Sequence, residues 1–179
     1  NEQESFEHTN WKPITIPFAV CQKSRLILGF KVGTIPPRKN AKKARKKYGP
    51  RQNQSKIKTE ALLKNLKNFQ LKGIIDSKVG FISDKKSTYP GVVSKYFPGA
   101  NHTTFKGRMA AVAGQGELKV GGNDPLFSLN HTLATVRYRI QTMARKTWCT
   151  TKLMEFLELR MSIFQTYFNM VRLIELDLV

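Results

Sequence analysis

Basic residues outnumber acidic residues by 31 to 12 in this chain of 179 residues, which gives a formal net charge of +19. Repulsion of that size opposes the compaction of a single domain unless an anionic partner screens it. The sequence is nevertheless 40% hydrophobic, which is sufficient for a buried core. The balance predicts one folded domain over residues 1–179 that binds a polyanion, with nucleic acid ahead of an anionic membrane surface.

The longest unbroken apolar run covers residues 109–113, whereas a membrane-spanning helix needs about 20 such residues. No secretion signal is recognisable, so we expect a cytoplasmic protein with no membrane partner. The chain opens at Asn1, directly in a strand-like pattern, and from this we expect an N-terminal piece to be missing.

The first third of the chain has the periodicity of strands. Residues 2–8, 14–20 and 26–32 are rich in β-branched and aromatic residues or alternate between apolar and polar, which predicts a three-stranded antiparallel meander. Pro17 lies inside the second segment, where it should weaken the strand or introduce a bulge.

Later segments predict helices between shorter strands. Helical spacing covers residues 56–68, and shorter patterns predict a strand at 79–83, a helix around 92–97 and a strand at 100–105. The glycine-rich stretch 107–123 has no phosphate-loop pattern and is predicted to be a loop. The order of these elements predicts a layered fold, α/β or α+β.

Two helices are predicted for the last third of the chain. Asp124-Pro125 is a typical helix start, and apolar residues recur at steps of three and four as far as Met143. A final helix is predicted over 152–168, with Phe156 and Tyr167 among its core residues.

Residues 36–54 form a basic insertion without a single acid. Its basic residues are Arg38, Lys39, Lys42, Lys43, Arg45, Lys46, Lys47 and Arg51. The segment could be a solvated flexible loop or an electrostatic arm for phosphate. We favour the arm, because each cation placed at a phosphate releases counterions and adds affinity.

Three parts of the chain carry a resemblance to a known family. They are residues 1–6 with the hairpin end at 28–30, residues 82–84 with Tyr89-Pro90, and residues 130–137 with the basic turn 144–152. In these segments the chain resembles the transposases of insertion sequence one, a class of short bacterial mobile elements.

The resemblance implies a ribonuclease-H-like α/β fold, with the meander, further strands and flanking helices. It also implies DNA strand transfer by three acids that hold two Mg²⁺ or Mn²⁺ ions, which prefer oxygen ligands and carboxylate charge. The implied partners are transposon-end and target DNA, with self-association on DNA, in the bacterial cytoplasm. The family's N-terminal DNA-binding region would be absent from these residues.

By the same resemblance, the catalytic and metal-binding positions are Asn1, Asp84 and Asn130. Asp84 fits the second acid, but asparagines stand where the family has its first aspartate and its glutamate. An amide offers a carbonyl oxygen and no charge, so we expect a copy with impaired activity. Glu117 and Asp124 remain alternative acids, whereas Glu2 should point to the opposite face of its strand.

Lysine and arginine side chains are expected to bind the DNA backbone, because the planar guanidinium of arginine binds two phosphate oxygens at once. The predicted nucleic-acid-binding residues are Arg38, Lys42, Lys43, Arg45, Lys46, Lys47, Arg137, Arg145, Lys146 and Lys152. An ordinary solvated surface is the alternative. Two other functions stay open: a non-catalytic nucleic-acid-binding module of the same fold, and a ribosome-associated RNA-binding protein.

Overall fold

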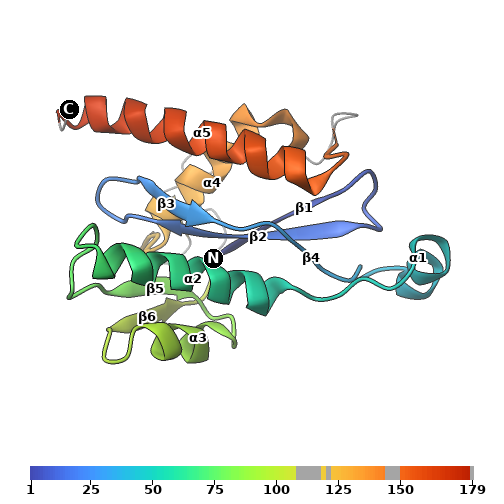
Figure 1. Ribbon diagram of the computed structural model, residues 1–179, viewed down its shortest axis with the longest axis horizontal. Coiled ribbons are helices and arrows are strands. Elements are labelled where there is room, and N and C mark those ends of the chain that lie inside the picture. The colour runs from blue at the N-terminus through green and yellow to red at the C-terminus, as the bar shows by residue number, and fades with distance from the viewer. Residues whose placement is uncertain (108–117, 120–121, 144–149, 178–179) are drawn as a thin grey trace.

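The computed structural model describes residues 1–107, 118–119, 122–143 and 150–177. The fold is mixed α/β, as predicted. A central antiparallel sheet is covered by helix α2 on one side and by helices α4 and α5 on the other (Figure 1). No helix among the described residues combines the length and the hydropathy that crossing a membrane requires.

The central sheet contains the predicted meander. Strand β1 (Glu2–Phe6) pairs antiparallel with β2 (Pro13–Val20). On its other edge β2 pairs antiparallel with β3 (Ile27–Phe30) and with the short β4 (Gly33–Thr34). The meander is therefore confirmed, but its third strand is split in two.

The position of Pro17 explains this split. Proline has no N–H to donate to a ladder. On the edge facing β3 and β4, Pro17 only accepts a hydrogen bond, from the Lys31 N–H at 3.2 Å, and regular pairing is interrupted there. The one register shift of the β2–β3 pair lies between Ala19 and Val20, so the bulge expected at Pro17 itself is not found there.

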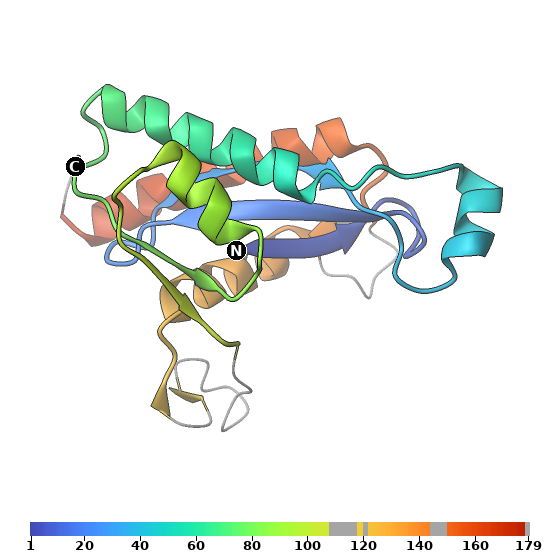
Figure 2. The ribbon, with the colours of Figure 1, turned by 90° about the horizontal axis from the view of Figure 1, so that it is seen from below.

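The basic insertion contains a helix, α1 (Ala41–Tyr48), so an entirely flexible loop is the wrong prediction for this part. Ala44 is buried, and the other seven residues of α1 are exposed. The helix projects beyond the end of the central sheet in both views of the ribbon (Figures 1 and 2). The next helix, α2 (Ser55–Leu71), confirms the helix predicted at 56–68.

Strands β5 (Phe81–Asp84) and β6 (His102–Phe105) form a separate parallel pair. Helix α3 (Tyr89–Tyr96) connects them and packs against α2. A second small core lies between these helices and consists of Leu63, Leu66, Val92, Val93 and Phe97. These elements agree with the predicted short strands and helix.

Only part of the predicted glycine-rich loop can be compared with the structure. The backbone of β7 (Leu118–Lys119) pairs antiparallel with that of β8 (Gly122–Asn123), so these four residues form a small hairpin. Residues 108–117, which include Glu117, lie outside the described residues.

The C-terminal part forms α4 (Phe127–Arg139), a 3₁₀ turn η1 (Gln141–Met143) and α5 (Met154–Glu175). The predicted helix start was too early, because Asp124 and Pro125 form a turn that precedes α4. The Leu126 N–H donates to Asp124 Oδ1 at 3.0 Å in that turn. The apolar stripe continues into η1, where Met143 is buried.

Helices α4 and α5 enclose the main core against the sheet. The buried residues of this core are Ile14, Ile16, Phe18, Ile27, Val32, Leu133, Val136, Ile140, Met143, Leu157 and Met161. Helix α5 is longer than predicted, and the placement of Phe156 and Tyr167 in the core was wrong. Their side chains are 56% and 61% exposed because α5 turns its Leu157–Met161 side toward the sheet.

Candidate functional site

Asn1 and Asp84 are in direct contact although 83 positions separate them. Asn1 continues the β1–β2 ladder, since its carbonyl accepts the Phe18 N–H at 2.8 Å. Its side-chain Oδ1 accepts the backbone N–H of Asp84, the last residue of β5, at 2.9 Å. This contact joins the start of the central sheet to the end of the β5–β6 pair.

Asn130 does not take part in the contact between Asn1 and Asp84. Its side chain is exposed on α4, and Nδ2 donates to Asp124 Oδ2 at 2.7 Å. Within the described residues, no hydrogen bond joins Asn130 to Asn1 or to Asp84. The acid that bonds Asn130 is thus Asp124, one of the two alternative acids considered from the sequence.

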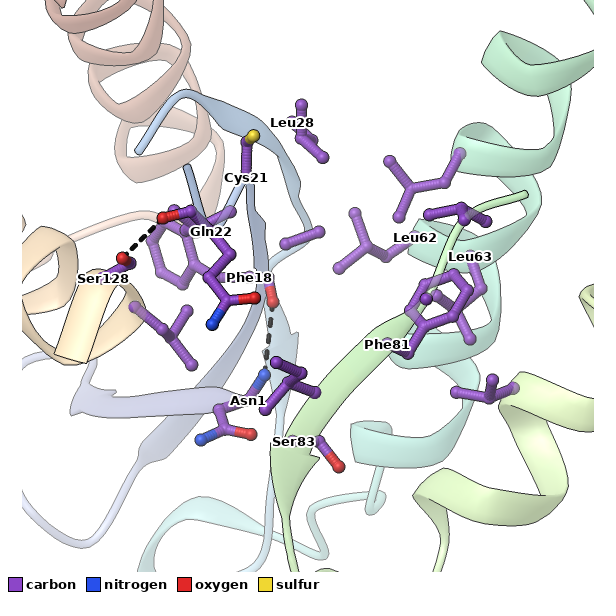
Figure 3. A pocket seen from close by; sticks show the side chains of 18 of the residues that line it. Asn1, Phe18, Cys21, Gln22, Leu28, Leu62, Leu63, Phe81, Ser83 and Ser128 are labelled. Atoms are coloured by element: carbon purple, nitrogen blue, oxygen red, sulfur yellow. Dashed lines mark hydrogen bonds between the residues drawn. The ribbon is translucent and has the colours of Figure 1, made fainter. Parts of the chain in front are cut away.

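A cavity of about 570 Å³ lies beside Asn1, between the sheet, α2, β5 and the start of α4. Figure 3 shows apolar side chains such as Phe18, Leu62 and Phe81 around it, with Asn1 and Ser83 at one end. Leu129, which precedes Asn130, also lines it. Of the three predicted positions, Asn1 lines the cavity, whereas Asp84 and Asn130 are represented there only by their chain neighbours Ser83 and Leu129.

Ser83 and His102 form a second polar contact at this cavity, with Ser83 Oγ 2.8 Å from His102 Nε2. Burial lowers the pKa of His102, which favours the neutral imidazole. Ser83 Oγ also donates to the Asp84 carbonyl at 2.9 Å, so the imidazole N–H is assigned as donor to Ser83. In that arrangement His102 cannot take the serine proton, and the pair is not an activated nucleophile.

Two divalent ions do not fit the donors that this corner offers. Asp84 is the one carboxylate among the three predicted positions, and its Oδ1 already accepts the Lys86 N–H at 3.1 Å. Asn1 Oδ1 is occupied by the Asp84 N–H. In the described part of the chain, no three His, Cys, Asp or Glu side chains gather around a possible metal position. A protein site commonly holds each Mg²⁺ ion through one or two carboxylates, so a single aspartate does not supply the ligands and charge for two ions.

Glu2 lies on the α2 side of β1, as strand alternation predicts, and its carboxylate enters a polar cluster that sequence reasoning missed. Its carboxylate accepts hydrogen bonds from Thr15, Ser55, Thr59 and Lys86 at 2.5–3.2 Å. Burial opposes ionisation of Glu2, but the bonds from Lys86, Thr15 and Ser55 outweigh it and lower its pKa. The cluster ties β1 and β2 to α2 and to the loop after β5.

The predicted cations lie in several places. Helix α1 brings five of them together on eight residues, namely Lys42, Lys43, Arg45, Lys46 and Lys47. Arg38, which precedes α1, pairs with Glu4 at 2.5 Å across an exposed surface. Helix α1 is therefore the densest basic surface that the structure describes for the predicted residues.

The remaining predicted cations belong to the C-terminal part. Arg137 is exposed on α4, and Lys152 is exposed before α5, where its Nζ donates to Thr150 Oγ1 at 3.2 Å. Arg145 and Lys146 lie outside the described residues. The phosphate clamp expected around α4 stays a prediction.

No protein-family model, curated protein or solved structure matches this chain. The assignment of a function therefore depends on the residues and on the geometry described above.

Proposed function

We propose that this chain is a ribonuclease-H-like catalytic domain of the insertion-sequence-one transposase type that binds DNA but lacks the charge to cleave it. The observation that carries the proposal is the contact between Asn1 and Asp84. It brings the first two predicted catalytic positions to one corner, at the ends of two strands that belong to different sheets.

The order of the elements supports the proposed fold. An antiparallel meander, a helix, a strand, a helix, a parallel strand and further helices follow one another along the chain. The third predicted position, Asn130, lies in the first turn of the helix whose start lines the cavity beside Asn1. These features agree with what the resemblance implies for such a domain.

The lack of carboxylate charge at these positions is the reason for proposing that the chain does not cleave DNA. Two of the three positions carry neutral amides, which cannot balance the charge of divalent ions beside a phosphate. DNA binding does not need those acids, because lysine and arginine contacts to phosphate supply it. The protein is thus proposed to bind DNA as a transposase does and to have lost the DNA-cleavage activity.

The test is a plasmid-nicking assay in Mg²⁺ or Mn²⁺ that compares the parent chain with the double variant Asn1→Asp/Asn130→Glu. The parent should bind DNA without nicking it, and the double variant should gain metal-dependent nicking that the additional change Asp84→Ala abolishes. The variant Asn65→Asp/Asn68→Glu makes the same charge change on exposed positions of α2 and should not nick. Nicking that survives Asp84→Ala would show that the site is misassigned.

A non-catalytic nucleic-acid-binding module is the second candidate. The density of cations on α1 favours it, because this surface needs no catalytic centre to hold a polyanion. In that case the parent and the double variant should both bind DNA in a salt-dependent manner, and neither should nick it.

A further inference from the structure

Helix α5 carries a long apolar stripe on the side that faces away from the core. Its positions alternate in steps of three and four from Leu153 to Ile174, which is the seven-residue repeat of coiled coils. The stripe begins at Leu153, the N-cap residue just before the helix, and continues on α5 with Phe156, Arg160, Ile163, Tyr167, Met170 and Ile174. The six apolar or aromatic members are between 50% and 63% exposed.

The helix cannot turn this stripe into the core. Gln165 and Asn169 both donate to the Ile27 carbonyl, at 2.9 and 3.0 Å, and Asn169 Oδ1 accepts the Ile27 N–H at 2.9 Å. On the same side, Leu157 and Met161 are buried against the sheet. These contacts fix the rotation of α5, so the outer stripe remains exposed as long as the inner face is packed.

We propose that this stripe binds the same stripe of a second copy, with the two α5 helices antiparallel. A stripe of six large side chains, each about half exposed, offers on the order of 600 Å² per copy, close to the about 800 Å² per partner of a standard interface. A groove of about 820 Å³ lies beside the N-terminal half of α5. It is lined by Phe156, Ile163 and Tyr167, among others, and leaves room for side chains of the partner.

The charge within the stripe selects the antiparallel orientation. Arg160 is its one charged member, and a parallel pair in register would bring the two Arg160 side chains together. An antiparallel pair centred near Ile163 places each Arg160 opposite Tyr167 of the second copy, where the guanidinium can stack on the ring. The same arrangement places Leu153 opposite Ile174.

Net charge opposes this association, because each copy carries +19. Salt screens that repulsion and leaves the apolar contact in place. The dimer is therefore expected to become more stable as the salt concentration rises, contrary to an association held by ion pairs.

The first experiment measures the molar mass of the full chain by sedimentation equilibrium at several protein and salt concentrations. The parent should dimerise reversibly, and Ile163→Lys should raise the dimer dissociation constant by about 30-fold or more, as expected for a central hot spot. Ser162→Lys adds the same charge at an exposed position outside the stripe and should stay within about threefold of the parent. Circular dichroism confirms that each variant is folded.

The second experiment tests the orientation by disulfide cross-linking, with Cys21 and Cys149 replaced by serine. A mixture of the Leu153→Cys and Ile174→Cys chains should give the mixed 153–174 cross-link in preference to 153–153 or 174–174. A parent that stays monomeric at every concentration overturns the proposal, as does equal dimerisation of Ile163→Lys and Ser162→Lys. Cross-links between identical positions alone overturn the antiparallel arrangement.

Discussion

Helices α1 and α5 both leave most of one side outside the core, but they expose opposite kinds of surface. Seven of the eight residues of α1 are exposed, and five of these are lysine or arginine. Helix α5 exposes a row of large apolar and aromatic side chains. Water solvates the first surface well and the second poorly, so the two helices call for different partners: a polyanion for α1 and an apolar surface for α5.

Polar contacts to the central sheet and to residues beside it anchor helix α5 itself and, in the case of α1, the segment that follows the helix. The segment after α1 is anchored by Arg51, which pairs with Glu7 at 3.2 Å and donates to the Pro13 carbonyl at 3.1 Å. Helix α5 is anchored through Gln165 and Asn169 to Ile27. The partners of the two helices should therefore be separable by mutation without unfolding the domain.

The largest effect is expected from the charge of α1. The variant Lys43→Gln/Lys46→Gln/Lys47→Gln should lose about 100-fold in affinity for a DNA duplex at physiological salt, since each lost phosphate contact lowers both the affinity and its salt dependence. The measurement is fluorescence anisotropy of a labelled duplex over a range of salt concentrations.

The matched control for α1 neutralises three lysines elsewhere. The variant Lys56→Gln/Lys64→Gln/Lys72→Gln changes exposed residues in and just after α2 and removes the same net charge. It should lose less than tenfold in affinity. Equal losses in the two triple variants would mean that overall charge, and not α1, sets the affinity.

The next effect concerns the scaffold that both helices share. Glu2→Gln leaves the Lys86 ammonium without its charged partner inside the cluster, so the free energy of unfolding should fall by about 2 kcal/mol. Urea denaturation measures this change. Glu4→Gln removes the exposed pair with Arg38 and should cost less than about 0.5 kcal/mol. Similar costs for both variants would contradict the role given to the Glu2 cluster.

A smaller effect links the two helices. If two copies pair through α5, each dimer presents two α1 helices to one duplex, and the second contact becomes intramolecular. Ile163→Lys should then weaken DNA binding about tenfold although it adds a positive charge. Anisotropy at protein concentrations that favour the parent dimer measures this, and tighter binding by the variant would contradict the link.

The smallest effect is a pH dependence of stability. The pKa of Glu2 is lower in the folded protein than its ordinary value of 4.5, so its contribution is present above that value and is lost as the pH falls through the folded pKa. Unfolding free energies measured between pH 7 and pH 3 should therefore decrease less for Glu2→Gln than for the parent. Parallel curves would show that Glu2 does not supply this dependence.

Local patterns predicted most of the fold. Strand alternation predicted the meander because Ile14, Ile16 and Phe18 enter the main core on one face, whereas Thr15 enters the polar cluster around Glu2 on the other. Helical spacing predicted α2, α4 and α5. The split of the third strand was not predicted, because it depends on which ladder edge Pro17 occupies. Helix α1 was not predicted either, since its apolar content is too low for a periodic signal.

The candidate site could be predicted less completely. The contact between Asn1 and Asp84 followed from a resemblance, and no local pattern indicates it. The cluster around Glu2 joins residues up to 84 positions apart, which no single sequence reveals. Phe156 and Tyr167 were assigned to the core because a core face and an exposed apolar face have the same helical spacing.

The central claim is that positions 1, 84 and 130 belong to one site, and Mn²⁺ titration of the restored variants tests it most directly. The experiment measures Mn²⁺ affinity for the parent, Asn1→Asp, Asn130→Glu and the double variant. The account predicts that the double variant gains clearly more binding free energy than the two single gains added together, because the restored acids share an ion with Asp84. Additive gains, or a double variant that binds no better than the parent, would contradict the claim.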